Sequence, residues 1–186
     1  MVGDLMASLG RGVASVGRGM ASTLLVLMIS VVVVGAGDDK AIGKTALEFV
    51  LPDQFEQEWA WEKHWKGKHT VMVLSDRSGS DYTNNWTKPL YERFKDRVQF
   101  VAIADVSSVP GFIKGLVRDK FKEAFTNSIL MDWEGDVCEY YMMQSGLPNV
   151  LYLDAKGIVR LHTWGKGSKD HLDAFATNVE RSLSRP

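Results

Sequence analysis

Apolar residues follow two different periods along the chain. Runs rich in β-forming residues at 69–75, 98–106 and 149–154 have few polar breaks, as expected for central strands that are covered on both faces. Elsewhere apolar residues recur at helical spacing, for example at Trp86, Leu90 and Phe94, which predicts helices with one buried face. Predicted strands span 48–52, 58–61, 69–75, 98–106, 128–132, 149–154 and 158–164, and predicted helices span 62–67, 84–96, 111–125, 136–143 and a last segment that Ser168 caps and that carries Leu172, Phe175, Val179 and Leu183.

The order of these elements indicates the fold class. Strands and helices alternate, and a hairpin turn at 154–157 joins the last two strands. Alternation of this kind favours a sheet with helices on both faces, and the hairpin adds an antiparallel pair. The sequence therefore predicts an α/β fold, a three-layer sandwich around a central mixed sheet.

The first 37 residues form a segment of different character. Arg11 and Arg18 precede the run at 23–36, which carries no charge and ends in small residues. As a helix, that run rises about 21 Å, less than the roughly 30 Å of a bilayer's hydrocarbon core. We therefore predict that residues 1–37 are a secretory signal peptide or, if uncleaved, that residues 20–37 anchor the protein to a membrane. Either outcome exports the remaining chain to the periplasm or another extracytoplasmic space.

Composition limits what the exported part can be. Residues 38–47 are polar and small and predict a linker, and residues 48–186 predict one domain. The 186 residues include 22 Lys and Arg against 23 Asp and Glu, and a net charge of −1 gives no basis for nucleic-acid binding.

Cys138 is the only cysteine, which excludes an intramolecular disulfide, a CxxC pair and a cysteine-rich zinc site. The four histidines lack metal-ligand spacing, and nucleotide-binding motifs are absent, so we expect neither a metal nor a cofactor.

Two blocks and one proline of the sequence carry a family resemblance. Block 49–74 contains two short strands, a turn, a Lys-Gly-Lys and a central strand, and block 128–165 contains Leu147-Pro148 and the terminal hairpin. Together with Pro89 inside a helix, these blocks resemble the thioredoxin superfamily, in its redoxin branch of alkyl hydroperoxide reductase and thiol-specific antioxidant-like proteins. The resemblance implies a thioredoxin-like sandwich in which Leu147-Pro148 is the cis-proline loop.

The chain departs from this family at the redox centre. The two cysteines of the family's CxxC motif lie eight and five residues before the helix proline, and Asp81 and Asn84 occupy these positions here. Peroxidase members need a reactive thiol in the same loop, and no cysteine lies within residues 76–89. We therefore expect an exported thioredoxin-like domain that has lost redox chemistry and serves as a non-catalytic binding or structural module.

Cys138 leaves a second interpretation open. It lies in a predicted short helix among Glu134, Asp136 and Glu139, and negative charge nearby disfavours a reactive thiolate. The first interpretation is a small apolar side chain packed in the core. The alternative is a one-cysteine oxidoreductase that reacts through Cys138 by forming mixed disulfides with other molecules.

The loop that replaces the redox centre is the candidate site. The resemblance places residues 76–82 beside Pro148 at the beginning of a helix, where free backbone N–H groups favour an anion or a partner's carbonyl. The expected partner is a protein or peptide, and a membrane is expected to contact the protein only through its N-terminal segment. Ser and Asp before a helix are also common caps, which is the structural alternative. The candidate residues are Arg77, Ser78, Ser80, Asp81, Tyr82, Asn84, Leu147 and Pro148.

Overall fold

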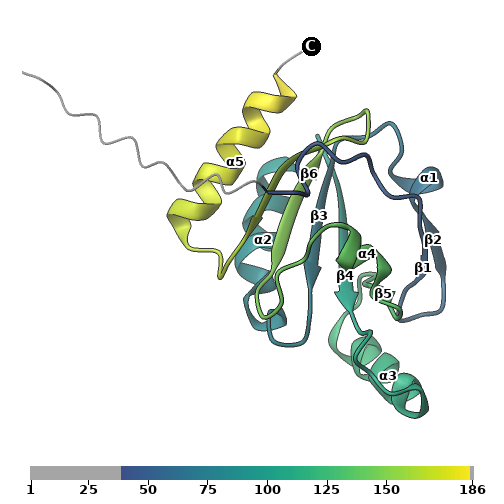
Figure 1. Ribbon diagram of the computed structural model, residues 1–186. Coiled ribbons are helices and arrows are strands. Elements are labelled where there is room, and N and C mark those ends of the chain that lie inside the picture. The colour runs from purple at the N-terminus through teal and green to yellow at the C-terminus, as the bar shows by residue number, and fades with distance from the viewer. Residues whose placement is uncertain (1–38, 185–186) are drawn as a thin grey trace, which may run out of the picture. The chain divides into compact units, whose positions relative to one another are not determined.

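The structure, a computed structural model, describes residues 39–184 (Figure 1). The segment 1–37, for which the sequence predicts a signal peptide or anchor, lies outside these described residues. Within residues 39–184, no helix combines the length and the apolar character that crossing a membrane requires.

Short helices and strands alternate through the described chain. The strands are β1 (Val50–Pro52), β2 (Glu58–Ala60), β3 (Thr70–Ser75), β4 (Gln99–Asp105), β5 (Leu130–Asp132), β6 (Asn149–Leu153) and β7 (Val159–Trp164). The helices are α1 (Trp61–His64), α2 (Thr83–Phe94), α3 (Lys114–Ala124), α4 (Asp136–Tyr140) and α5 (Lys169–Leu183), with 3-10 turns η1 (Ser80–Tyr82) and η2 (Gly111–Ile113).

Five strands form a central mixed sheet in the order β5-β4-β3-β6-β7. β3, β4 and β5 are parallel to one another, whereas β6 is antiparallel to both β3 and β7. β3 lies in the middle, and all its residues are buried, as its unbroken β-forming sequence predicts. β1 and β2 form a separate antiparallel hairpin. The predicted mixed sheet is confirmed.

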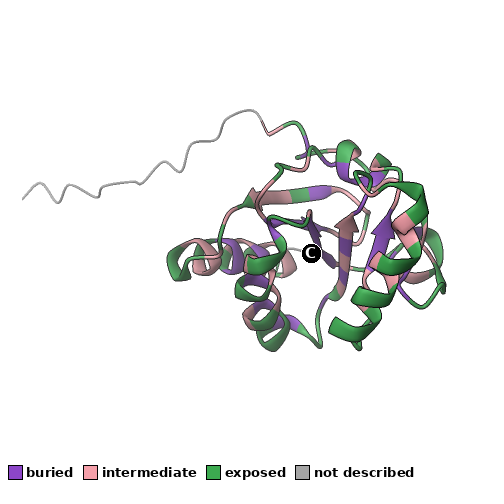
Figure 2. Ribbon diagram, turned by 90° about the horizontal axis from the view of Figure 1, so that it is seen from below, coloured by how far each residue is buried: buried purple, intermediate pink, exposed green. Residues whose placement is uncertain are grey.

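Alternate residues of β3 support two cores on opposite faces of the sheet. Val71 and Val73 pack with Trp86 and with the buried side chains of α5 on one face. Met72 and its neighbours on the same side pack with residues of α1, α4 and the β1 region on the other face. Figure 2 shows the buried strands between helices whose outer sides are exposed. The three-layer α/β sandwich predicted from the sequence is therefore correct.

The predicted helix 111–125 differs from the observed chain. It divides into η2 and α3, and no residue of either is buried. α3 lies beyond the ends of β4 and β5, where it projects from the sheet (Figure 1). The apolar periodicity of this segment predicted a buried face, but none of the described residues covers that face fully.

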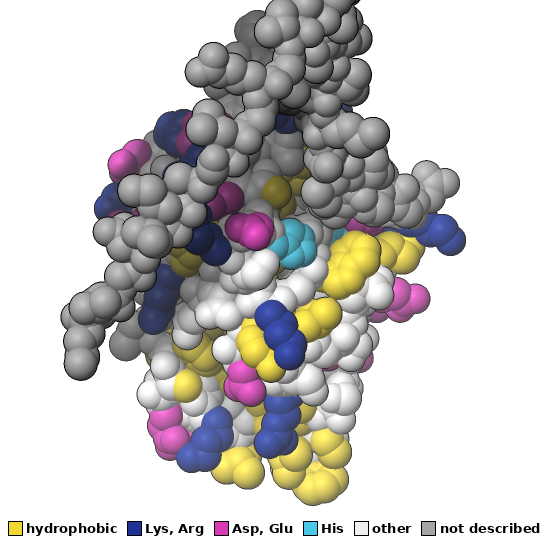
Figure 3. Space-filling view, turned by 90° about the vertical axis from the view of Figure 1, so that its left-hand side faces the viewer, with side chains coloured by type: hydrophobic (Ala, Val, Ile, Leu, Met, Phe, Trp, Pro, Cys, Tyr) yellow, Lys and Arg dark blue, Asp and Glu magenta, His cyan; other side chains and the backbone are white. Residues whose placement is uncertain are grey.

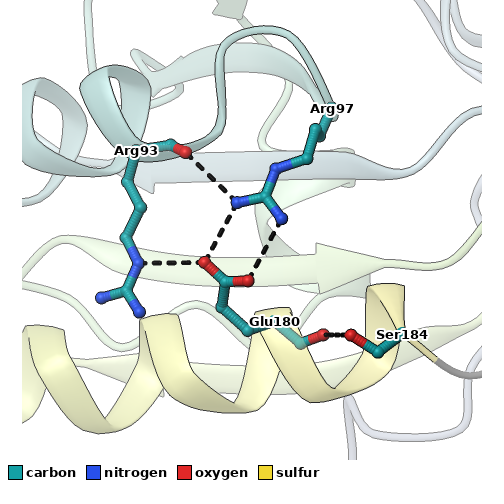
Figure 4. A network of polar contacts seen from close by, with 4 residues as sticks. All are labelled: Arg93, Arg97, Glu180 and Ser184. Carbon is teal, nitrogen blue, oxygen red and sulfur yellow. Dashed lines mark hydrogen bonds and ion pairs between the residues drawn. The ribbon is translucent and has the colours of Figure 1, made fainter.

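An ion-pair network joins the outer sides of α2 and α5 (Figure 4). The carboxylate of Glu180 accepts hydrogen bonds from Arg93 Nε at 3.2 Å and from Arg97 Nη1 and Nη2 at 3.1 and 3.0 Å. These groups are solvated, so they add little stability. In the core, Trp86 of α2 and Phe175 of α5 are both buried, and their ring centroids lie 6.0 Å apart.

The predicted linker 38–47 is partly wrong. Ala41 is fully buried, Gly43 N–H donates to the Val159 carbonyl, and the Val159 N–H donates to the Lys44 carbonyl. The Tyr141 hydroxyl accepts the Leu47 N–H at 3.0 Å, which fixes the same segment to the chain after α4. This polar segment is therefore not a free linker, because its backbone pairs with the outer side of β7 at Val159.

Ser168 lies at the N-cap of α5 with an extended backbone, as predicted, but its side chain makes no capping hydrogen bond. Its carbonyl accepts the Leu172 N–H, so the backbone alone begins this helix.

Neighbouring residues of α2 provide a test of the packing. Leu90 is fully buried and Tyr91 is 51% exposed. We expect Leu90→Ala to lower the free energy of unfolding by about 2–5 kcal/mol, because it leaves a cavity in the core. Tyr91→Ala is the matched control and should cost about 1 kcal/mol or less. Chemical denaturation followed by tryptophan fluorescence measures both, and equal losses would contradict this packing.

Candidate functional site

Asp76 connects the loop after β3 to a loop from the second half of the chain. Its Oδ1 accepts the Gly79 N–H at 2.8 Å. Its Oδ2 accepts the Ser145 hydroxyl at 2.6 Å and the Gly146 N–H at 2.7 Å. One carboxylate therefore holds both loops that make up the candidate site.

The two loops are also in direct backbone contact. A Cβ atom on Gly79 would lie 2.7 Å from the Leu147 carbonyl carbon, which is closer than a side chain can approach. Only glycine allows this approach. The contact places residues 76–82 beside Leu147 and the buried Pro148, as the family resemblance implied.

A third segment, the chain after β7, completes the site. The Gly165 N–H donates to the Pro148 carbonyl at 3.1 Å, and the Gly165 carbonyl accepts Trp86 Nε1–H at 2.7 Å. The Lys166 ammonium lies 4.8 Å from the centre of the Tyr82 ring, which is the geometry of a cation–π contact. Tyr82, Pro148 and Lys166 therefore come together from three separate parts of the chain.

The side chain of Asn149 fixes the shape of the 144–147 loop by hydrogen bonds to its backbone. Its Nδ2 donates to the carbonyls of Gln144 and Leu147, both at 2.8 Å, and its Oδ1 accepts the Gln144 N–H at 2.8 Å. His162 approaches Oδ1 from β7 at 3.3 Å, while its other ring nitrogen lies 2.8 Å from the Asp39 carboxylate. Asn149 is thus hydrogen-bonded to the loop that carries Pro148, and His162 of β7 is hydrogen-bonded to Asn149.

Solved structures of other proteins share this architecture. Thiol:disulfide interchange protein DsbE from Chlorobium tepidum superposes with a TM-score of 0.60 at 19% identity, covering 77% of this chain and 98% of that one. The exposed lipoprotein thioredoxin of Streptococcus pneumoniae gives 0.56 at 16% identity over 71% and 99% of the two chains. Thiol peroxidase from Chromobacterium violaceum gives 0.53 at 16% identity over 76% and 87%.

The chain has a thioredoxin fold. At the level of sequence, no protein-family model matches the chain, and a search of curated proteins finds no match either. The structural likeness establishes the architecture, and the chemistry must be judged from the residues present.

In this thioredoxin fold, most of the site residues predicted from the sequence are exposed. Asp81 lies in η1 and Asn84 in the first turn of α2, and both are exposed. Arg77, Ser78 and Ser80 are also exposed, whereas Tyr82 and Leu147 are half-buried.

The side chains of Ser80 and Asp81 do not cap η1 or α2, whereas Asp76, in the same loop, accepts the N–H of Gly79 at the start of η1. The Ser80 hydroxyl donates to the Arg77 carbonyl instead, at 2.7 Å. The loop's internal bonds are supplied by Asp76, and the Asp81 carboxylate is not used to begin the helix.

Asp76, Ser145, Asn149 and Gly165 organise the site and were absent from the predicted residues. An acid directly after a buried strand is a signal for Asp76, because such a carboxylate commonly accepts turn N–H groups. Its partners Ser145 and Gly146 lie far along the chain, and nothing in the local sequence points to them.

Cys138 is enclosed, with 2% of its surface exposed. Burial raises the pKa of its thiol strongly, and the carboxylates of Asp132, Asp105 and Asp76 raise it further. Its own N–H donates to Asp132 Oδ2 at 2.9 Å, which fixes it in the first turn of α4. Cys138 and Ser145 line the same depression of about 280 Å³. The raised pKa keeps the thiol protonated at neutral pH.

Among residues 39–184, no three His, Cys, Asp or Glu side chains are arranged to hold a metal ion. The candidate site in the described chain is a surface of loops with one exposed carboxylate, one exposed guanidinium and one aromatic ring.

The bonds of Asp76 predict a pH-dependent contribution to stability. Burial alone would raise the pKa of this carboxyl, but hydrogen bonds from Ser145, Gly79, Gly146 and Ser78 outweigh it and lower the pKa. A lowered folded-state pKa stabilises the fold above the unfolded value of about 3.9. That stabilisation disappears as the pH falls through the folded-state pKa.

We expect Asp76→Asn to lower the free energy of unfolding at pH 7 by about 1.5–3 kcal/mol. Its difference from the unsubstituted protein should shrink below about pH 4. Asp81→Asn, a change at an exposed carboxylate of the same loop, is the control and should have little effect. Urea denaturation from pH 3 to 7 measures both, and a difference that stays constant over this range would disprove the role of Asp76.

The environment of Cys138 predicts an unreactive thiol. Iodoacetamide at pH 8 should alkylate the folded protein at least roughly 100-fold more slowly than the protein unfolded in guanidinium. Ser80→Cys in a Cys138→Ala background provides an exposed thiol as control and should react at the same rate in both states. Rapid alkylation of Cys138 in the folded protein would show that the thiol is accessible and ionised.

Proposed function

We propose that this protein is an exported binding module with a thioredoxin fold, without thiol–disulfide catalysis of its own. One observation carries the proposal: exposed Asp81 and Asn84 occupy the two positions where the family resemblance expects cysteines, and the only thiol, Cys138, is buried. Disulfide exchange needs an accessible thiolate, and a carboxylate and an amide cannot supply one.

The proposed partner is a protein or peptide segment that lies across the loop 76–82 and Pro148. Arg77 offers an exposed side-chain donor, and the exposed Ser80 hydroxyl, whose hydrogen goes to the Arg77 carbonyl, offers an acceptor. Tyr82, with Lys166 over its ring, offers a flat apolar surface beside a positive charge. An extended segment with acceptor groups and one apolar side chain fits these features.

Export is the second part of the proposal and rests on the sequence. The uncharged run at 23–36 follows Arg11 and Arg18, as in segments that direct secretion. Under the oxidising conditions outside the cytoplasm, a chain with a single cysteine can form no internal disulfide, and its thiol can pair only with another molecule.

An insulin-reduction assay with dithiothreitol tests the lack of catalysis. The unmodified protein should give the background rate, because it has no pair of thiols. Asp81→Cys with Asn84→Cys restores two cysteines at the family's spacing and serves as the positive control for the assay. Turnover by the unmodified protein that Cys138→Ser abolishes would overturn the proposal and establish the one-cysteine oxidoreductase.

A binding measurement tests the proposed site. Decapeptides are selected on the immobilised full chain from a random phage-displayed library, and the affinity of the best one is measured by fluorescence anisotropy. Arg77→Ala with Tyr82→Ala should weaken that affinity at least roughly tenfold, the effect of losing about 1.4 kcal/mol. Lys88→Ala with Tyr91→Ala, exposed positions on α2 outside the loop, is the matched control. Unchanged affinity in the loop variant would locate binding elsewhere.

A further inference from the structure

The N-terminal end of α3 exposes two large apolar side chains. Phe112, in η2, is 89% exposed, and Leu116, one turn later in α3, is 60% exposed. The two side chains lie on either side of the junction between η2 and α3, and together they give this end of α3 an exposed apolar surface, the apolar patch. Figure 3 shows hydrophobic side chains gathered at the lower end of the molecule, the end that α3 occupies in Figure 1. A helix of this length without a buried residue gains little from its own packing, and a partner on this face would stabilise it.

The cations of α3 already have acidic partners within the chain. Lys114 pairs with Glu134, Arg118 with Glu56, and two further pairs, Lys120 with Glu123 and Lys122 with Asp119, lie along the helix. These pairs neutralise the positive charge around the apolar patch. The helix is therefore a poor match for an anionic membrane or a nucleic acid, both of which need unpaired cations.

The depression that Cys138 and Ser145 line is acidic, and it lies between this patch and the candidate site. Asp105, Glu134 and Glu139 line it, and no Lys or Arg in the described part of the chain does. Lys114 of α3 reaches Glu134 at one side of the depression, at 3.5 Å. Ser145 lines the other side and donates to Asp76 of the site loop. The apolar patch, the acidic depression and the site loop therefore follow one another across the surface.

From this order we infer that the segment bound at the loop 76–82 extends across the depression onto α3, and that it carries a Lys or Arg followed by a bulky apolar residue. The cation would lie among Asp105, Glu134 and Glu139, because no Lys or Arg of residues 39–184 lines the depression and Lys114 reaches Glu134 only from one side. The apolar residue would cover Phe112 and Leu116. This inference rests on the proposed function, because it names the chemistry of the partner that the loop would bind.

The phage selection described above provides the test, with the full chain in a mild detergent and two added surface variants. One is Glu134→Gln with Glu139→Gln, and its matched control is Glu58→Gln with Glu92→Gln, a pair of exposed carboxylates elsewhere. The other is Phe112→Ser with Leu116→Ser, and its matched control is Val50→Ser with Tyr91→Ser, a pair of exposed apolar residues elsewhere. Circular dichroism confirms that each variant is folded before binding is measured.

We expect the selected decapeptides to be enriched in Lys or Arg followed by an apolar residue. Each surface variant should bind the best peptide at least roughly tenfold more weakly, and the controls should bind it unchanged. Peptides without this pattern, no enrichment above background, or equal binding by the surface variants would overturn the inference. Self-association that Phe112→Ser with Leu116→Ser abolishes, seen by sedimentation velocity, would also overturn it, since the patch would then bind a second copy.

The loop variant Arg77→Ala with Tyr82→Ala separates the two proposals. If it loses binding while both surface variants retain it, the loop binds a partner but the extension to α3 is wrong. If it retains binding while the surface variants lose it, the acidic and apolar surface binds a partner and the loop does not.

Discussion

Aspartates at the ends of strands fix the loops of this protein. Asp53 follows β1, Asp76 follows β3, Asp105 and Asp132 end β4 and β5, and Asp154 follows β6. Each carboxylate accepts at least one backbone N–H from the residues that follow it. A turn N–H that is held by a carboxylate has no need of water or of a disulfide to define its position. The chain thus fixes its connections with aspartate side chains, in the absence of any cysteine pair.

Two of these aspartates, Asp76 and Asp132, act at the candidate site and around Cys138. Asp76 joins two loops that belong to different halves of the chain, while Asp132 fixes Gly135, Val137 and Cys138 at the start of α4. The same carboxylates surround the only thiol and disfavour its ionisation. The hydrogen bonds that fix the loops therefore also keep Cys138 unreactive, and the exposed functional groups of the site are those of Arg77 and Asp81, with Tyr82 half-buried beside them.

Most of the fold and part of the candidate site could be predicted from the sequence. Trp86, Leu90 and Phe94 are spaced for one helix face, and all three are fully buried, because local periodicity reports which side of a helix faces the core. The same reasoning failed at α3, since a periodic pattern shows that an apolar face exists but not whether the chain itself covers it. Asp76 was missed as the organiser because Ser145 and Gly146 lie 69 and 70 positions away. Residues 41–46 resembled a linker because backbone pairing leaves no mark on composition.

The pairing of residues 43–46 with the end of the hairpin has a consequence for how copies of this protein meet. A sheet edge with free N–H and carbonyl groups can add a strand from another molecule, which is a common route to aggregation. Here the outer side of β7 is occupied near Val159 by the chain's own segment, and β5, at the other edge, is short and bridged at Leu130 by Asp53. Both edges of the sheet are thus occupied in part within one molecule, near Val159 and at Leu130, which leaves less free edge for a strand of another copy.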